Sequence, residues 1–322
     1  MAVVESNTSH EPVPTPIEKW AAIAGRWTFS ERQVKYTGPE KPEDPFPLGL
    51  ALSSERFRDG RLATRIKLQR NERIAAGIFF GYESLNSPYL SAQIGGFDRA
   101  FSISEYRPGR GWFQLAGVGT ISNLDVAQTH SLSVELKGQT VRMMVDGVDD
   151  VLEPVLLPQP IIGTRIGLYA WGDAENQFSD TKIERFDPRI FVSMPFAEPY
   201  DTLYHEVIAP VAQRERFKPV RVDEIPRPVR ILDDIEQQIK ESHAIVAEIS
   251  TNNPNVFYEL GYAHALKKPT VLLARTDKKF KKRKSPFNIS GFREIRYKNN
   301  IGGTKKIERN LTSYLKALRK DT

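Results

Sequence analysis

One carboxylate, Glu259, lies in an aromatic stretch near the start of an expected helix, and it is the best candidate for chemistry in this chain. The helix follows the strand-like run 244–250. Asn253 suits its cap, and Pro254 suits its first position, where no backbone N–H is needed. Glu259 then falls on the second turn, above the carboxyl end of the preceding strand, where open parallel sheets bind ligands.

Partners for Glu259 are expected where neighbouring strands end. Ser193 could hold a ribose hydroxyl or a phosphate, or be a plain turn hydroxyl. Asp223 could orient or protonate a base or pair with an arginine, and Glu248 could serve the site or a structural ion pair. Gly261 is expected to let another backbone approach the helix. The expected substrate-binding residues are Ser193, Pro195, Phe196, Asp223, Glu248, Ser250, Asn253, Asn255, Tyr258 and Tyr262.

Two segments carry a family resemblance. The stretch 253–269 contains Glu-Leu-Gly-Tyr-Ala followed by Lys-Pro, and 189–196 reads Arg-Ile-Phe-Val-Ser-Met-Pro-Phe. Together they resemble the nucleoside 2-deoxyribosyltransferase-like superfamily, a relative of TIR-type NAD-cleaving domains, over roughly residues 189–297. The resemblance implies that Glu259 is the nucleophile that attacks the anomeric carbon of a (deoxy)ribose. The chain departs from the classical transferases at 250–255, where Ser-Thr-Asn-Asn-Pro-Asn replaces their base-handling Asp.

The resemblance implies cleavage or transfer at an N-glycosidic bond of NAD, a nucleoside or a nucleotide, without a cofactor. Nicotinamide leaves a cation as a neutral molecule, so NAD cleavage needs no general acid and suits a chain without that Asp. The resemblance also implies a bacterial defence effector. The rival hypothesis is a non-catalytic nucleotide sensor, which asparagine amides favour because they bind a ligand without moving protons.

Length and composition limit the remaining classes. At 322 residues, two domains are expected after a disordered lead at 1–19. The chain has no cysteine, which excludes disulfides and thiol catalysis, and no apolar run long enough to span a membrane. We expect a cytoplasmic protein, and a homo-oligomer stays open. No metal site is expected, because turn solvation explains the acidic residues 146–150.

Positive charge gathers in the second half of the chain. Residues 188–322 hold 26 basic and 16 acidic side chains, and the first part holds 20 and 24. Six of the seven residues at 278–284 are basic, and Lys281, Lys282 and Lys284 are expected to bind phosphate, with a solvated loop as the alternative. Nucleic acid is disfavoured, since Phe280 is the one aromatic side chain available there for stacking.

Residues 20–187 show the period of strands with one buried face, as at 62–69, and a hairpin returning over 141–147. Their order resembles concanavalin A-like jelly rolls of the laminin-G or 3-keto-disaccharide hydrolase type. We expect an all-β sandwich that recognises a glycan or a protein. Trp112 and Trp171 could stack on a sugar or belong to the core.

After residue 187 the pattern changes to alternating strands and helices. Apolar strands are expected near 190–194, 219–222, 244–249, 270–274 and 294–297, and helices near 200–211, 231–239, 254–265 and the C-terminus. This alternation predicts an α/β domain over 188–322, a flavodoxin-like parallel sheet with helices on both faces.

Overall fold

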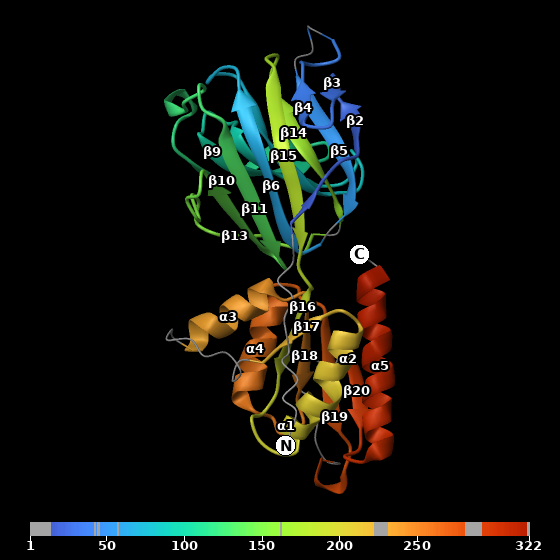
Figure 1. Cartoon of the computed structure of the whole chain (residues 1–322). Helices are drawn as coiled ribbons and strands as arrows, with labels where there is room; N and C mark the ends of the chain where they lie inside the picture. Colours follow the sequence, from blue (N-terminus) through green and yellow to red (C-terminus); the bar gives the residue numbers. More distant parts are fainter. Residues whose placement is uncertain are drawn as a thin grey trace, which may run out of the picture.

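The computed structural model describes residues 14–41, 43, 46–56, 58–161, 163–221, 231–280 and 292–320, which form two domains (Figure 1). The first is a sandwich of two antiparallel sheets, and the second is a parallel five-stranded sheet with helices. The prediction of an all-β sandwich followed by an α/β domain is confirmed. Among the described residues, no helix has both the length and the apolar character needed to cross a membrane.

The sandwich is built from strands of three to ten residues and two shorter edge pieces. One sheet runs β13 (Val155–Leu156), β12 (Thr140–Val145), β11 (His130–Lys137), β6 (Gly60–Leu68), β15 (Asn176–Arg185), β4 (Gln33–Tyr36) and β3 (Trp27–Phe29), with β1 (Thr15–Pro16) also on β15. The other runs β10 (Gly111–Val118), β9 (Phe101–Arg107), β8 (Tyr89–Gly95), β7 (Ala75–Tyr82), β14 (Arg165–Trp171), β5 (Leu48–Arg56) and β2 (Trp20–Ala24).

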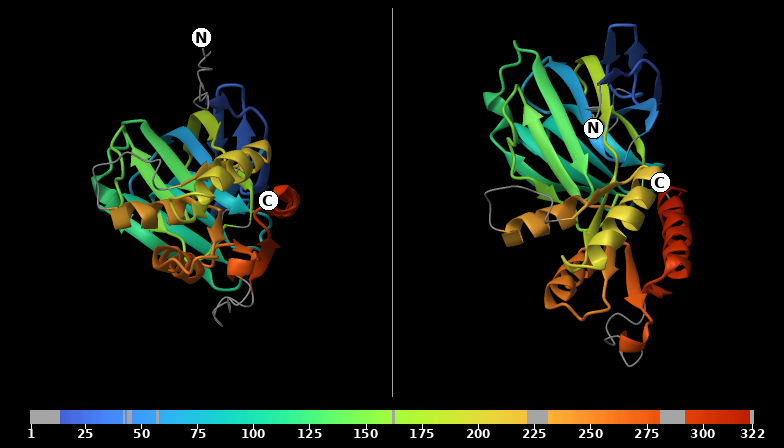
Figure 2. Two further views of the ribbon diagram at one scale, coloured as in Figure 1. Left: turned by 90° about the horizontal axis from the view of Figure 1, so that it is seen from below. Right: turned by 60° about the horizontal axis from the view of Figure 1, so that its bottom comes forward.

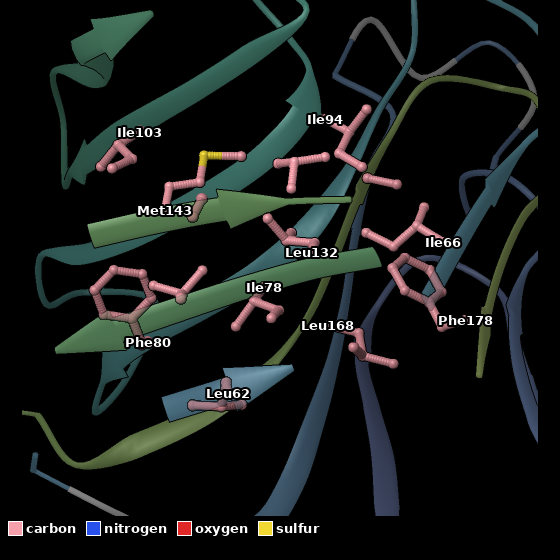
Figure 3. Packing of buried hydrophobic residues seen from close by; sticks show 14 of the residues in the cluster. Leu62, Ile66, Ile78, Phe80, Ile94, Ile103, Leu132, Met143, Leu168 and Phe178 are labelled. Carbon is pink, nitrogen blue, oxygen red and sulfur yellow. The ribbon is translucent and has the colours of Figure 1, made fainter. Parts of the chain in front are cut away.

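Alternating apolar side chains from the two sheets fill the space between them. Leu62 and Ile66 of β6 face inward because side chains two apart share one face of a strand. Figure 3 shows them packed with Ile78 and Phe80 of β7, all at most 1% exposed. The last part of the expected lead is ordered and joins this domain: Ile17 is buried and its N–H donates to the Thr181 carbonyl, so residues 15–17 lie against β15.

The hairpin of β11 and β12 touches the second domain. Gly138 turns the chain with φ +57°, and a Cβ there would lie 2.7 Å from the Glu241 carbonyl. Beside it, the Gln139 N–H donates to the Lys240 carbonyl at 3.1 Å. This tip therefore needs glycine for its conformation and for close approach.

In the second domain the sheet order is β17 (Lys218–Val220), β16 (Arg189–Ser193), β18 (Ala244–Glu248), β19 (Thr270–Arg275) and β20 (Arg293–Tyr297). Every neighbouring pair is parallel. In chain order this is 2-1-3-4-5, a common doubly wound order whose switch point lies between β16 and β18.

Helices cover both faces of this sheet (Figures 1 and 2). One face packs against α1 (Tyr200–Leu203), which continues through a π-helical turn into α2 (Ala209–Arg214), and against α5 (Ile301–Lys320). The other face packs against α3 (Ile231–Glu241) and α4 (Pro254–Ala265). Asn253 caps α4 by accepting from the Asn255 N–H, with Pro254 at the first position, as predicted.

Candidate functional site

A polar side chain lies at the carboxyl end of each strand of the parallel sheet. Ser193, Glu248, Arg275 and Tyr297 are the last residues of β16, β18, β19 and β20, and Arg221 follows β17 directly. Since the strands are parallel, all five lie along one edge of the sheet, in the order Arg221, Ser193, Glu248, Arg275, Tyr297.

Glu259 belongs to this edge although it comes from α4. It is 7% exposed, and Ser193 Oγ donates a hydrogen bond to Glu259 Oε2. Burial raises the pKa of the Glu259 carboxyl above its usual value, and the Ser193 hydrogen bond offsets part of that shift. The pair joins the end of β16 to the helix that follows β18, so a buried carboxyl lies at the switch point.

Glu248 is the second buried carboxyl, at 1% exposure. It accepts hydrogen bonds from the Tyr297 hydroxyl at 2.7 Å and from the Ser250 N–H at 2.8 Å. Ser250 Oγ in turn accepts from the Arg275 N–H at 2.7 Å. Burial and the neighbouring Glu248 carboxylate raise the pKa of Tyr297 far above its usual value. The network holds three strand ends in register and gives Glu248 hydrogen-bonding partners of its own.

Of the two arginines along this edge, Arg221 is buried and Arg275 is partly buried. Arg221 has a side chain only 3% exposed, forms an ion pair with Asp201 and lies 5.0 Å from the Phe196 ring centre. Arg275 forms an ion pair with Asp277 at 2.7 Å. Both guanidinium groups are therefore held at the edge by carboxylates, on either side of the serine and the two glutamates.

Other predicted site residues lie around the buried Ser193, Glu248 and Glu259. Phe196 is 56% exposed and Pro195 half-buried, both in the loop after β16. Asn255 is exposed, and the Asn253 side chain is engaged in the cap. The tyrosines are placed on the side of α4 that faces α3: the Tyr258 hydroxyl donates to Glu236 at 2.9 Å, and the Tyr262 ring lies 5.9 Å from Lys240 Nζ.

Some predictions fall on residues outside those described, namely Asp223, Lys281, Lys282 and Lys284. The expectation for Gly261 is wrong for the part of the chain that the structure describes: a Cβ on Gly261 would meet no described atom within 4 Å, so no described backbone approaches the helix there.

The strand ends at Arg221, Arg275 and Tyr297 were not predicted as site positions. The sequence holds a signal for Arg275, which directly follows the apolar run 271–274; Arg221 and Tyr297 end stretches that also contain charged residues, so no apolar run marks them. The sequence predicts a second strand that extends to residue 222 and is followed by Asp223; the strand ends at Val220, and Arg221 takes the strand-end position.

A separate aromatic layer covers the outer face of the sheet that contains β8. Tyr89, Ser91 and Gln93 alternate along β8 with core residues and therefore point away from the core. All three are at most 2% exposed. Tyr89 Oη, Ser91 Oγ and Gln93 Oε1 are buried without a hydrogen-bond partner among the described residues. Tyr106 and Trp112 pack on Tyr89, with ring centres at 5.0 and 5.5 Å.

No protein-family model matches the chain. No curated protein matches it either. Solved structures similar to the N-terminal region include a CBM66 carbohydrate-binding module from Bacillus subtilis, at 17% identity and a TM-score of 0.42, covering 52% of this chain and 96% of that one.

A β-glucanase from Bacillus licheniformis is similar at 12% identity and a TM-score of 0.40, over 55% of this chain and 99% of that one. A protein of unknown function with a galectin-like fold, from Bacillus subtilis, is similar at 12% identity and a TM-score of 0.39, over 53% and 94%. Similarity at this level concerns the course of the chain through the sandwich and says nothing about ligands.

Proposed function

We propose that the second domain cleaves or transfers the N-glycosidic bond of a nucleotide-type substrate, with Glu259 acting at C1′. The observation that carries the proposal is the buried Glu259–Ser193 pair at the switch point of a doubly wound sheet. A buried carboxyl with a shifted pKa in such a place is a candidate for catalysis rather than for stability alone.

The proposed reaction is a substitution at C1′ of the sugar, with the Glu259 carboxylate placed against that carbon. The bond between C1′ and the base nitrogen breaks, its electron pair leaves with the base, and a Glu259 oxygen bonds to C1′ or stabilises the developing cation. Water or an acceptor hydroxyl then replaces the carboxylate. Ser193 orients the carboxylate through its hydrogen bond.

NAD fits this site best among nucleotide substrates. Burial keeps the pKa of Glu259 raised in the free protein, and the positive nicotinamide riboside would lower it by attraction between opposite charges. The lowered pKa would favour the ionised, nucleophilic form of Glu259 in the complex. Arg221 and Arg275, on either side of the pair, would place positive charge near a pyrophosphate.

The test is release of free base from NAD and a panel of nucleosides and nucleotides, followed by chromatography. Glu259→Gln keeps the shape of the side chain and should reduce release by roughly two to four orders of magnitude, the range for loss of a catalytic group. Glu236→Gln on α3 is the matched control and should keep activity. Full activity in Glu259→Gln would remove Glu259 from the mechanism.

A nucleotide sensor is the second candidate, and the exposed Asn255 at the start of α4 favours it. An amide can hydrogen-bond a ligand without moving protons. Calorimetry distinguishes the two functions. Nucleotide binding that is lost in Glu259→Ala, together with no base release by the wild type, would establish the sensor.

For the sandwich we propose glycan recognition on the outer face around β8. The rings of Tyr106 and Trp112 are partly exposed on this face and could stack on a sugar face. Trp112→Ala should weaken retention on soluble glycans in affinity electrophoresis. Phe113→Ala, at the next position of β10 and on its other face, is the control. Equal retention of wild type and Trp112→Ala would refute glycan binding here.

A further inference from the structure

A cavity of about 350 Å³ lies where the two domains meet. Pro188, His243 and Pro269 line it, and each directly precedes a strand of the parallel sheet: β16, β18 and β19. The cavity is therefore at the amino ends of these strands. Glu259 lies at their carboxyl ends, roughly 15 Å away for strands of five residues. The two sites are separate.

Positive charge dominates the wall of the cavity. Five of its side chains are arginine or lysine and one is a carboxylate. The sandwich contributes two of the basic side chains and the second domain three. They are Arg58, Arg185, Arg216, Arg319 and Lys268, the last with a pKa that burial lowers to about 7, and the carboxylate is Asp187.

Helix ends account for part of this charge, since cations are stabilised at helix carboxyl termini. Lys268 Nζ donates to the carbonyls of Lys240 and Ser242 at the end of α3, and Arg319 lies in the last turn of α5. Arg58 and Arg185 belong to the sandwich and lie at no helix end; Arg185 forms an ion pair with Glu55, and its Nε donates to the Arg56 carbonyl at 3.2 Å. The charge therefore exceeds what the helices need.

The wall is otherwise largely apolar, with Ile161, Phe186, Phe217 and Leu318. Gln139 is fully buried in the wall; its Nε2 donates to the Leu157 carbonyl, and its Oε1 has no partner among the described residues. Small-molecule sites combine such apolar walls with a few polar groups in volumes of roughly 300–1,000 Å³. This cavity has both the composition and the size.

We propose that the cavity binds a small organic anion, a phosphate or carboxylate on an apolar body, and that the bound anion ties the two domains together. Arg58 and Arg185 reach it from one domain and Arg216 and Lys268 from the other. A ligand held by both sets stabilises the contact between the domains by mass action. The site is thus a place where a metabolite could act on both domains at once.

The test uses phenyl phosphate and benzoate, with phenol as the uncharged control, in calorimetry on the full chain. Both anions should bind and phenol should bind at least tenfold more weakly. Arg216 forms no ion pair among the described residues, so Arg216→Gln removes ligand contact without breaking one. Loss of a charged hydrogen bond should weaken phenyl phosphate roughly tenfold or more. Hydrogen exchange at 138–139 and 240–243 should slow when the anion is bound.

Two variants make the result specific. Arg214→Gln also removes one positive charge, but Arg214 lies on α2 and does not line the cavity. This variant should bind phenyl phosphate as the wild type does. Glu259→Gln should also bind normally, because its site is at the other end of the sheet, so failure of the proposed catalysis leaves this test intact. Equal binding of phenol, unchanged binding in Arg216→Gln, or loss of binding in Glu259→Gln would each overturn the proposal.

Discussion

Replacing Asp59 by Asn should stabilise the protein above neutral pH. Asp59 is 3% exposed at the contact between the domains, and its Oδ1 accepts from the Gly138 N–H at 2.9 Å. Burial raises its pKa to about 7. The neighbouring basic groups His243 and Lys268 offset little of a negative charge on Asp59. Burial lowers the pKa of His243 to about 3 and that of Lys268 to about 7, so neither holds a proton firmly. Charging Asp59 is therefore costly in the folded state.

The expected gain in stability follows from the pKa shift of Asp59. The pKa moves from 3.8 to about 7, and at about 1.4 kcal/mol per unit the charged form costs the fold about 4 kcal/mol. The unfolded chain loses this proton at lower pH than the folded chain does, so this contribution to stability falls as pH rises from about 4 to about 7 and stays low above that. An asparagine at this position has no proton to lose. Its amide oxygen can keep the Gly138 bond, and its nitrogen can donate to His243 Nδ1, which lies 3.3 Å from Asp59 Oδ2.

The assay is urea unfolding of wild type and Asp59→Asn at pH 4, 6 and 8. The variant should gain about 4 kcal/mol between pH 4 and pH 8 relative to the wild type. Asp98→Asn, on an exposed turn of the same domain, should show no such gain. A difference that does not change with pH, or a variant less stable than wild type at pH 8, would show that Asp59 is charged and well paired.

Three further changes test the geometry of the second domain and its junction. Gly138→Ala should destabilise the domain contact by more than Gly109→Ala in limited proteolysis: both glycines have positive φ, but only Gly138 faces a carbonyl, that of Glu241. Gly261→Ala should raise the free energy of unfolding by roughly 0.5–1 kcal/mol, since the added methyl meets no atom and alanine favours the helix; a loss of stability would mean that the site is crowded. Glu259→Gln should become more stable than wild type as pH rises above the ordinary pKa range of a carboxyl, because the raised pKa makes ionisation of the buried Glu259 unfavourable. Thermal unfolding at several pH values measures this, and a variant that loses stability as pH rises would contradict it.

Local patterns in the sequence were enough to predict most elements. Strand alternation at 62–68 depends on one buried face, and the cap at Asn253 depends on neighbours only two residues away. The change of pattern after residue 187 also indicated a sandwich followed by an α/β domain. These features can be predicted from the sequence because the spacing of apolar residues, the residues of turns and the caps of helices each depend on a few neighbouring residues.

Tertiary structure alone decided which strand ends become neighbours. The order 2-1-3-4-5 places Ser193 beside Glu248 and brings Glu259 to Ser193, 66 positions away in the chain. Tyr297 reaches Glu248 from the far edge strand in the same way. Strand order depends on packing between distant segments, which no local pattern encodes.

The contact between the domains was equally beyond the sequence. Asp59 and His243 meet because the β5–β6 turn lies against the end of α3, and burial from both sides shifts their pKa values. Each residue by itself looks like an ordinary surface side chain. Local residues therefore suffice to predict the elements and the candidate side chains, whereas the desolvation that shifts the pKa values of Asp59 and His243 arises only when the two domains pack together.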